Sequence, residues 1–426
     1  MKPPLYSIQP PAPRGPALNK LRYRQSVHLE KSRPLSLSPV TRKDRVLRSV
    51  VAAIGLFALD SQSRQALALA NMELVFVSFL LAALVGTASA YSFLTLGDWG
   101  GAALGAQDKA NVYAVADAMA AAATEQPPAF ILNTGDNFYW CGIQNTSDYQ
   151  IHVDFELPYS QPSLANLQWY SVLGNHEYGY NVDAELQYAM INSKWVMDSR
   201  YYTKRVLADS STQTYISFIF LDTSPCISGY RKTNPANWDP CSTQYPTCSL
   251  QSTTDDFEGP CNFHANIVSQ SCETQFAWFK SQLAAVPADD WLIVVGHHPI
   301  DEINVADFTS ALQERGFSIY FNGHAHTLTQ YSIDGSGAYV TSGAGALVNT
   351  ADQKHELTSK KVAGMDIPAD LGVGQNHSYT TLFNQKVAGF TRSTFDAGFT
   401  TLKTDFLSYT GAVVHSFQVN KQGALL

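Results

Sequence analysis

The hydrophobic and polar positions after residue 90 follow a repeated pattern. Five β-prone hydrophobic stretches stop at a glycine that is followed by Asp, Asn or His: "YSFLTLGD" (91–98), "AFILNTGD" (129–136), "QWYSVLGNH" (168–176), "WLIVVGHH" (291–298) and "SIYFNGHAH" (318–326). Helical patterns at 106–124, which stops before Pro127 and Pro128, and at 273–285 separate some of these stretches. Strands that alternate with helices predict βαβ units and an α/β fold.

The polar residues at the strand ends predict a single site. In open α/β sheets, ligands bind at the carboxyl ends of the strands. We expect the glycines to supply the positive φ and the close backbone approach that a tight strand-to-loop turn requires. One such end alone is more typical of an ordinary turn, but five together indicate a metal site. The His-x-His spacing strengthens this interpretation, because it places both imidazoles on the same side of a strand.

The metal-binding side chains divide into two sets by the hardness of their donor atoms. The first set is rich in anionic oxygen and comprises Asp98, Asp136, Tyr139 and His326. The second set is mostly neutral nitrogen and comprises Asn175, His297 and His324, with Asp136 predicted to bridge both sets. Ionising a phenol of pKa about 10 near pH 5 costs roughly 7 kcal/mol, which a hard cation such as Fe(III) offsets. The second set suits a divalent ion such as Fe(II), Zn(II) or Mn(II).

Five short motifs resemble the signature of the purple acid phosphatases, within the calcineurin-like metallophosphoesterases: "GDWGG", "GDNFY", "GNHE", "GHHP" and "GHAHTLTQY". The match is greatest to the small, single-domain, tartrate-resistant type and covers essentially residues 91–426. Tyr139, three residues after the acid of the second motif, is the discriminating mark. The resemblance implies a four-layer α/β/β/α sandwich of two mixed sheets flanked by helices. It also implies a purple, monomeric acid phosphatase that acts on small phosphate monoesters or phosphopeptides.

Two histidines beside the ligands are predicted to be catalytic. By the resemblance, two metals hold the phosphate and activate a hydroxide for in-line attack. His176 then binds a phosphate oxygen or protonates the leaving group. Small family members carry a second outer histidine nine residues beyond the ligand of the fourth motif, where this chain has Ala306. His298 is the predicted replacement, with Asp301 or Glu302 left open as alternatives, and we expect a weakened or shifted acid limb of the pH profile.

Two rival functions stay open. The first is a phosphodiesterase or nucleotide pyrophosphatase on the same scaffold, which Tyr139 disfavours. The second is a secreted iron- or phosphate-binding protein with incidental turnover. His176 together with the complete ligand set argues against storage, because storage needs no acid for a leaving group.

The chain before residue 91 is predicted to be distinct from the catalytic domain. Residues 1–45 are rich in proline and arginine without an apolar period, and residues 1–71 carry 12 Lys and Arg against 3 Asp and Glu, which predicts a disordered basic leader over 1–71. Residues 72–90, "MELVFVSFLLAALVGTASA", have the apolar core and small-residue cleavage site of a secretory signal peptide. We predict that Met72 is the biological start and that the preceding residues are a gene-model extension. An uncleaved signal anchor is the alternative; otherwise we expect a secreted protein with no stable membrane partner.

The charge balance excludes one class of partner. From residue 91 onward the chain carries 16 Lys and Arg against 32 Asp and Glu. Nucleic-acid binding needs a basic face, so an acidic body argues against it. It does not argue against small phosphates, which a local positive charge can hold.

Cysteine usage predicts disulfides in a secreted protein. All 6 cysteines follow residue 140, and five of them lie within 226–272, in a polar, proline-rich insertion at 225–275. The pairing is not readable from sequence, although Cys141 could join the insertion. The insertion could wall the pocket with Tyr230, Trp238 or Tyr245, or it could be a stapled surface loop remote from the substrate. Possible glycosylation sequons at Asn145 and Asn376 fit the secretory route.

Overall fold

A computed structural model describes residues 90–233, 238–241, 248, 261–349 and 377–426. The predicted leader at 1–71 and the predicted signal peptide, up to residue 89, lie outside the described residues, as do Tyr245 and Asn376. Asn145 is described and exposed. Among the described residues, none of the helices combines the length and the apolar character that crossing a membrane requires.

The first sheet is mixed and has seven strands in the order β14-β13-β12-β1-β2-β3-β4. Strands β1 to β4 run parallel to one another, and β12 pairs antiparallel with β1. The strand bounds are β1 (Ser92–Leu96), β2 (Ile131–Asn133), β3 (Trp169–Ser171), β4 (Trp195–Val196), β12 (Gly389–Phe395), β13 (Thr401–Ser408) and β14 (Val413–Asn420).

The second sheet is also mixed, with seven strands in the order β11-β9-β10-β8-β7-β6-β5. Its centre, from β6 through β7 and β8 to β10, is parallel, and antiparallel strands complete both edges. The bounds are β5 (Tyr202–Asp209), β6 (Thr214–Phe220), β7 (Trp291–Val295), β8 (Ile319–Asn322), β9 (Leu328–Ile333), β10 (Ser336–Ser342) and β11 (Tyr379–Gln385).

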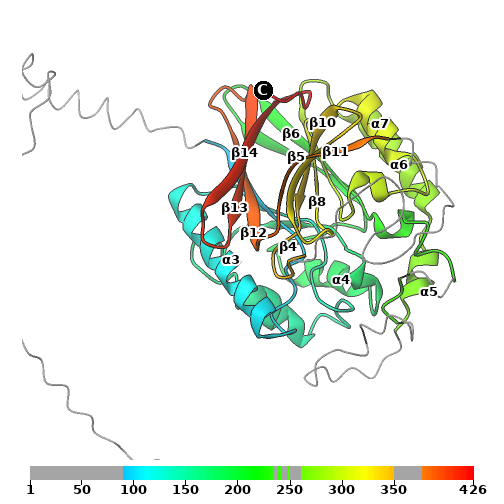
Figure 1. The fold of residues 1–426 in the computed structure, drawn as a ribbon. Helices are drawn as coiled ribbons and strands as arrows, with labels where there is room; N and C mark the ends of the chain where they lie inside the picture. Colours follow the sequence, from blue (N-terminus) through cyan, green and yellow to red (C-terminus); the bar gives the residue numbers. More distant parts are fainter. Residues whose placement is uncertain (1–89, 234–237, 242–247, 249–260, 350–376) are drawn as a thin grey trace, which may run out of the picture. The chain divides into compact units, whose positions relative to one another are not determined.

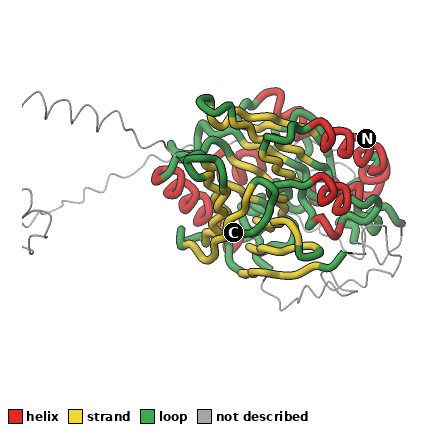
Figure 2. Tube along the Cα trace, turned by 90° about the horizontal axis from the view of Figure 1, so that it is seen from above, coloured by secondary structure: helices red, strands yellow, loops and turns green. Residues whose placement is uncertain are grey.

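Helices cover the outer faces of the two sheets. Figure 1 shows α3 (Ala106–Glu125) beside β12 and β13, and α6 (Cys272–Ala285) with α7 (Phe308–Arg315) on the opposite side. Seen from above, helices lie on both sides of the strands (Figure 2). Two further helices are α4 (Asp183–Ile191) and α5 (Phe263–Val268), labelled in Figure 1. The predicted helices at 106–124 and 273–285 agree with α3 and α6 to within one residue. The expected sandwich of two mixed sheets flanked by helices is therefore confirmed.

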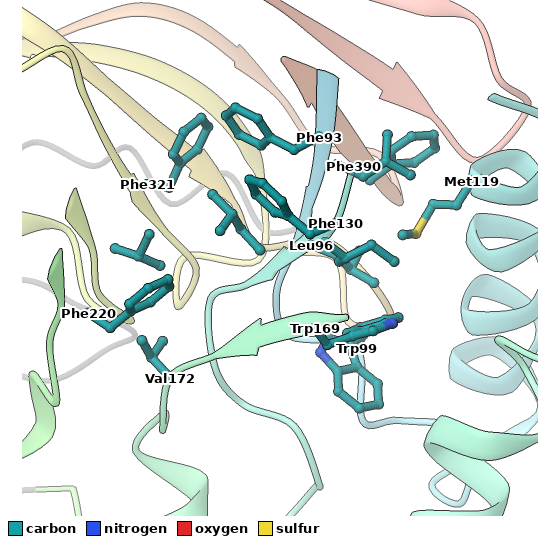
Figure 3. Close-up of a cluster of buried hydrophobic side chains, with 14 of the residues drawn as sticks. Phe93, Leu96, Trp99, Met119, Phe130, Trp169, Val172, Phe220, Phe321 and Phe390 are labelled. Carbon is teal, nitrogen blue, oxygen red and sulfur yellow. The ribbon is translucent and has the colours of Figure 1, made fainter. Parts of the chain in front are cut away.

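Aromatic side chains fill the space between the sheets. The Phe93 ring lies 5.3 Å from that of Phe130 in the first sheet and 5.9 Å from that of Phe321 in the second. Figure 3 shows these rings pointing toward one another, with Met119 of α3 on the other side of the first sheet. Both faces of the central strands are covered, so every residue of β1 and β7 is buried. This is why these strands appear in the sequence as continuous hydrophobic runs.

A histidine joins three elements of the second half of the fold. His377, just before β11, contacts Asp334 in the β9–β10 turn through Nδ1 (2.5 Å) and Asp307, which caps α7, through Nε2 (3.2 Å). Although partial burial opposes it, the hydrogen bonds to Asp334 and Asp307 raise the pKa of His377 above its ordinary value. A raised pKa means that the folded chain holds this proton more tightly than the unfolded chain does.

We therefore expect this junction to stabilise the fold at acid pH. Its contribution is complete below the unfolded pKa of about 6.5 and is lost as the pH rises through the higher folded pKa. His377→Ala should lower the melting temperature by roughly 1–2 °C at pH 5.5, the size expected for a partly exposed ion pair. At pH 9.5 the two proteins should melt closer together. Equal differences at both pH values would contradict the prediction.

Candidate metal centre

The register of the parallel strands brings the predicted site residues together. Leu96 pairs with Asn133 and Asn133 with Ser171 in the first sheet, while Val295 pairs with Phe321 in the second. The loops after these strands are joined by backbone hydrogen bonds, from Asp98 N–H to Gly135 O (2.9 Å) and from Gly323 N–H to His297 O (2.9 Å). All seven predicted ligands therefore lie at one edge of the two sheets.

Most glycines at the strand ends are needed because other loop atoms pass close to their Cα atoms, and not because their backbone has an unusual conformation. A Cβ on Gly174 would lie 2.1 Å from Asp136 Oδ1, and one on Gly323 would lie 2.4 Å from Asp98 Oδ2. Of the five strand-end glycines, only Gly135 has a positive φ (93°), so the expectation that they all supply positive φ is wrong. Four predicted ligands that follow these glycines adopt the left-handed conformation instead, with these φ values: Asp98 (56°), Asp136 (51°), His324 (70°) and His326 (53°). Non-glycine residues held in this region are typical of functional sites.

The oxygen-rich set converges on the Tyr139 hydroxyl. Tyr139 Oη lies 3.2 Å from Asp98 Oδ1, 3.1 Å from Asp136 Oδ2 and 3.1 Å from His326 Nε2. His326 Nε2 is also 3.3 Å from Asp98 Oδ1. Asp98, Asp136 and Tyr139 are buried, whereas the side chain of His326 is 26% exposed. The set therefore opens to solvent on the His326 side.

The nitrogen-rich set converges on the Asn175 amide oxygen. Asn175 Oδ1 lies 3.0 Å from His297 Nε2 and 3.0 Å from His324 Nδ1. Asp136 reaches this set with the oxygen that Tyr139 does not use, because Asp136 Oδ1 is 3.3 Å from His297 Nε2. One carboxylate thus presents one oxygen to each set, which is the arrangement of a bridging ligand.

The charge distribution fits a cluster built for cations. Burial raises the pKa of Asp98, and burial together with the Asp136 and Asp98 carboxylates raises the pKa of Tyr139 well above its ordinary value. Although burial opposes it, the Asp136 carboxylate raises the pKa of His297 to about 9. Over the described ranges, the ion-pair partners of Asp98 and Asp136 are histidines, with no lysine or arginine among them. Buried anions without such partners fit bound metal ions, and carboxylate, phenol and imidazole are donors that iron and zinc accept.

His176 lies at the edge of the oxygen-rich set. Its Nδ1 lies 2.6 Å from the Trp140 carbonyl, so Nδ1 carries the proton and donates it there. Its Nε2 faces the site at 3.9 Å from Asp136 Oδ2. Burial lowers the pKa of His176, against the opposing effect of Asp136. The backbone therefore orients this ring with one nitrogen free toward the site.

His298 is held entirely by protein groups. Its Nδ1 lies 2.7 Å from Thr223 Oγ1, its Nε2 lies 3.3 Å from Tyr230 Oη, and its ring packs 4.3 Å from that of His324. The ring is fully buried, and burial together with His324 lowers its pKa well below the ordinary value. Its predicted catalytic role stays a prediction, since both ring nitrogens have partners. Ala306 is buried in the core cluster that includes Ile300 and Phe308.

The described part of the insertion lies against the site. Three disulfides hold it: Cys141–Cys248, Cys226–Cys272 and Cys241–Cys261. The first joins the insertion to the loop that carries Tyr139. The Trp238 ring packs edge-on at 5.1 Å from the His176 ring, and Tyr230 contacts both Trp238 and His298. The sequence left two alternatives for the insertion: a wall of the pocket or a remote surface loop. The structure places Tyr230 and Trp238 beside the predicted site residues, as the first alternative expects.

Two supporting residues were not recognised in the sequence. Glu177, in "GNHE", accepts backbone N–H groups from Asp136 (3.1 Å), Asn137 (2.8 Å), Phe138 (3.1 Å) and Gly174 (2.6 Å). It therefore ties the loop after β2 to the loop after β3. Thr223 lies three residues after β6, which is followed by Leu221 and Asp222 and not by a glycine, and it orients His298. An acid directly after the predicted catalytic histidine His176 was the available signal for Glu177; Thr223 had none.

Comparisons with known proteins agree with this geometry. Residues 91–328 match the family model described as Calcineurin-like phosphoesterase. The chain is 32% identical to tartrate-resistant acid phosphatase type 5 of Rattus norvegicus over 284 residues, which is 62% of this chain and 76% of the rat protein. It is 28% identical to purple acid phosphatase 7 of Arabidopsis thaliana over 257 residues, 60% of this chain and 70% of that protein.

A solved structure shares the fold. GAP50, titled the anchor in the inner membrane complex of Plasmodium, aligns with a TM-score of 0.53 and 20% identity. The alignment covers 78% of this chain and 89% of GAP50. At this identity the likeness concerns the fold alone, since one fold hosts many functions.

Removal of metal should destabilise the chain. A cation that binds only the folded state at 100 times its Kd adds about 2.7 kcal/mol, so chelation should lower the melting temperature by several degrees. Asp136→Asn should abolish this chelator-dependent shift, because it removes the oxygen that both sets share. Asp290→Asn alters a buried acid that pairs with Arg205 away from the site, and should retain the shift. Equal chelator shifts in wild type and Asp136→Asn would contradict the assignment.

Proposed function

The chain belongs to the calcineurin-like phosphoesterase family, alongside the tartrate-resistant and purple acid phosphatases, and we propose that it is a secreted acid phosphatase with an Fe(III)–M(II) centre. The observation that carries this proposal is the Tyr139 hydroxyl, which lies within 3.2 Å of two carboxylates and a histidine nitrogen. Burial beside two acids makes this phenol hard to ionise by itself. A trivalent cation between these groups would offset that cost.

The two sets of side chains would hold two different metals. Asp98, Tyr139 and His326 suit Fe(III), Asn175, His297 and His324 suit Fe(II), Zn(II) or Mn(II), and Asp136 would serve both. When bound, such a pair supplies positive charge for the phosphate and lowers the pKa of a water to produce the nucleophile. The protein contributes the position of each donor and the burial that strengthens electrostatic interactions.

His176 is the residue we assign to the leaving group. Because its Nδ1–H is donated to the Trp140 carbonyl, Nε2 is the nitrogen that can hold a proton at the site. A phosphate monoester between the two metal sets would place its bridging oxygen within reach of this nitrogen, which would bind phosphate or donate the proton. His298 remains the proposed second outer histidine, acting through His324 and Tyr230, which its ring contacts.

The insertion supports a substrate of limited size. Trp238 and Tyr230 form a wall beside His176 and His298, and Phe263 packs behind both at 5.1 and 5.3 Å. We therefore propose small phosphate monoesters or phosphopeptides as substrates, and neither nucleic acid nor a membrane as a partner. A monomer remains our expectation.

Disulfides support the proposed location. All six cysteines are paired, which is typical of secreted proteins and rare in the cytosol. We propose that the chain reaches the secretory route through residues 72–90, with membrane anchoring as the outcome if this segment is not cleaved.

The visible spectrum tests the central claim. Purified protein should show two metals per chain and a broad green absorption band from phenolate-to-Fe(III) charge transfer, lost on dithionite treatment. Tyr139→Phe should abolish the band. Tyr159→Phe removes a buried hydroxyl that has no hydrogen-bond partner among the described residues, and it should retain the band. A colourless oxidised wild type, or a Tyr139→Phe variant of unchanged colour, would overturn the Fe(III) assignment.

Kinetics test the reaction class and the role of His176. The wild type should hydrolyse p-nitrophenyl phosphate much faster than bis(p-nitrophenyl) phosphate; the reverse order would favour the phosphodiesterase alternative.

His176→Ala should lower kcat/KM for the monoester about 100-fold or more, the usual contribution of a general acid. His152→Ala alters an exposed histidine paired with Glu156 and should match the wild type. An unchanged rate in His176→Ala would remove this residue from the mechanism.

A further inference from the structure

A carboxylate lies behind His324, on the side away from the other ligands. His324 Nδ1 faces Asn175 Oδ1 at 3.0 Å, while its Nε2 lies 3.5 Å from Glu302 Oε2. A neutral imidazole can give a lone pair to a metal at Nδ1 only when its proton is on Nε2. Glu302 Oε2 can accept a hydrogen bond from this Nε2–H if the 3.5 Å distance between the two atoms shortens slightly.

The position of Glu302 is costly for the fold. Glu302 ends a short turn (Ile300–Glu302) directly after "GHHP", and its N–H donates to Pro299 O at 3.0 Å. Its side chain is only 11% exposed, and its Oε1 is buried without a hydrogen-bond partner among the described residues. A buried acid without a lysine or arginine partner among the described residues points to a role in function.

A small cavity with hydroxyl and amide groups in its lining adjoins Glu302. Glu302 lines this cavity together with Thr327, Thr341, Tyr379 and Asn384. Hydroxyl and amide groups of this kind can hold a water against a buried carboxylate oxygen. Oε1 itself is buried, so the cavity lies beside the side chain of Glu302 without a contact to that oxygen.

The two histidines of the nitrogen-rich set have different outer partners. His297 presents Nε2 to the set, and its Nδ1 lies 2.8 Å from the Thr134 carbonyl, a neutral acceptor. The acceptor nearest the outer nitrogen of His324 is a carboxylate. A carboxylate behind a ligand histidine fixes its tautomer and raises its basicity, and loss of such a partner typically costs 10- to 100-fold in metal affinity.

We propose that Glu302 is a positioning residue for the second, divalent metal, holding the Nε2–H of His324 so that Nδ1 binds the ion. The proposal rests on the proposed dinuclear function and adds a residue outside the predicted ligand set. It also separates the two metal sites, since Glu302 contacts a ligand of the nitrogen-rich set and none of the oxygen-rich set.

Zinc titration of four proteins tests the proposal. Wild type, Glu302→Ala, Glu302→Gln and Asp301→Asn are stripped of metal, given one equivalent of Fe(III), and equilibrated with graded Zn(II) in a chelator buffer. Bound zinc is measured by metal analysis, and the iron site is followed by its green absorption. Asp301→Asn is the matched control, because Asp301 is a buried acid of the same turn without a contact to a ligand histidine among the described residues.

We expect Glu302→Ala to raise the zinc concentration at half-occupancy 10- to 100-fold. Glu302→Gln, which keeps the shape of the side chain and a weaker acceptor, should fall between Glu302→Ala and the wild type. Asp301→Asn should titrate like the wild type, and the iron absorption should stay constant in all four. Excess Zn(II) should restore kcat in Glu302→Ala, which it could not do for a damaged fold.

Three results would overturn the proposal. One is a Glu302→Ala titration that coincides with the wild type. Another is a Glu302→Ala protein that loses the iron absorption together with zinc, since that reports general damage. A third applies if Glu302→Ala does not fold. In that case, a zinc titration curve of Glu302→Gln that coincides with the wild-type curve would overturn the proposal. A wild type that binds iron but no zinc would count against the proposed dinuclear function itself, and so is distinguishable from a failure of Glu302 alone.

Discussion

The carboxylate of Asp136 is shared between two groups of predicted metal ligands, and much of the local architecture follows from that sharing. Its Oδ2 faces Tyr139 and its Oδ1 faces His297. To reach both, the residue adopts a left-handed backbone (φ 51°), and its side chain passes so close to Gly174 that no Cβ fits there. Glu177 then holds the surrounding N–H groups in place. Gly174 and Glu177, both in "GNHE", thus position the carboxylate of Asp136, which belongs to the separate motif "GDNFY".

Charge explains why such a site calls for metal. Two acids and a phenol are buried together, and over the described ranges the ion-pair partners of both acids are histidines. Burial raises the pKa of Asp98, and burial with both carboxylates raises the pKa of Tyr139, so the surroundings disfavour the charged forms that a cation would favour. Metal binding and folding stability are therefore coupled through the same buried groups.

The insertion shows how a shared scaffold acquires an individual site. One fold can host many functions, so the sandwich that this chain shares with GAP50 does not by itself define the chemistry. In this chain, disulfides attach an aromatic wall to the loop that carries Tyr139, next to His176. The walls of the site are thus built from a segment that is separate in sequence from the metal-binding motifs.

The sequence alone determined the class of fold and the set of residues at the sheet edge. Those properties depend on local features: hydrophobic runs that mark buried strands, and donor atoms placed directly after them. Other properties depended on contacts between distant segments, and only the tertiary structure decided them. These include the cysteine pairing, the φ values of the ligands, the wall formed by Trp238, and the approach of Glu302 to His324. A single sequence records the type of each side chain, but not which distant neighbour the packing will place beside it.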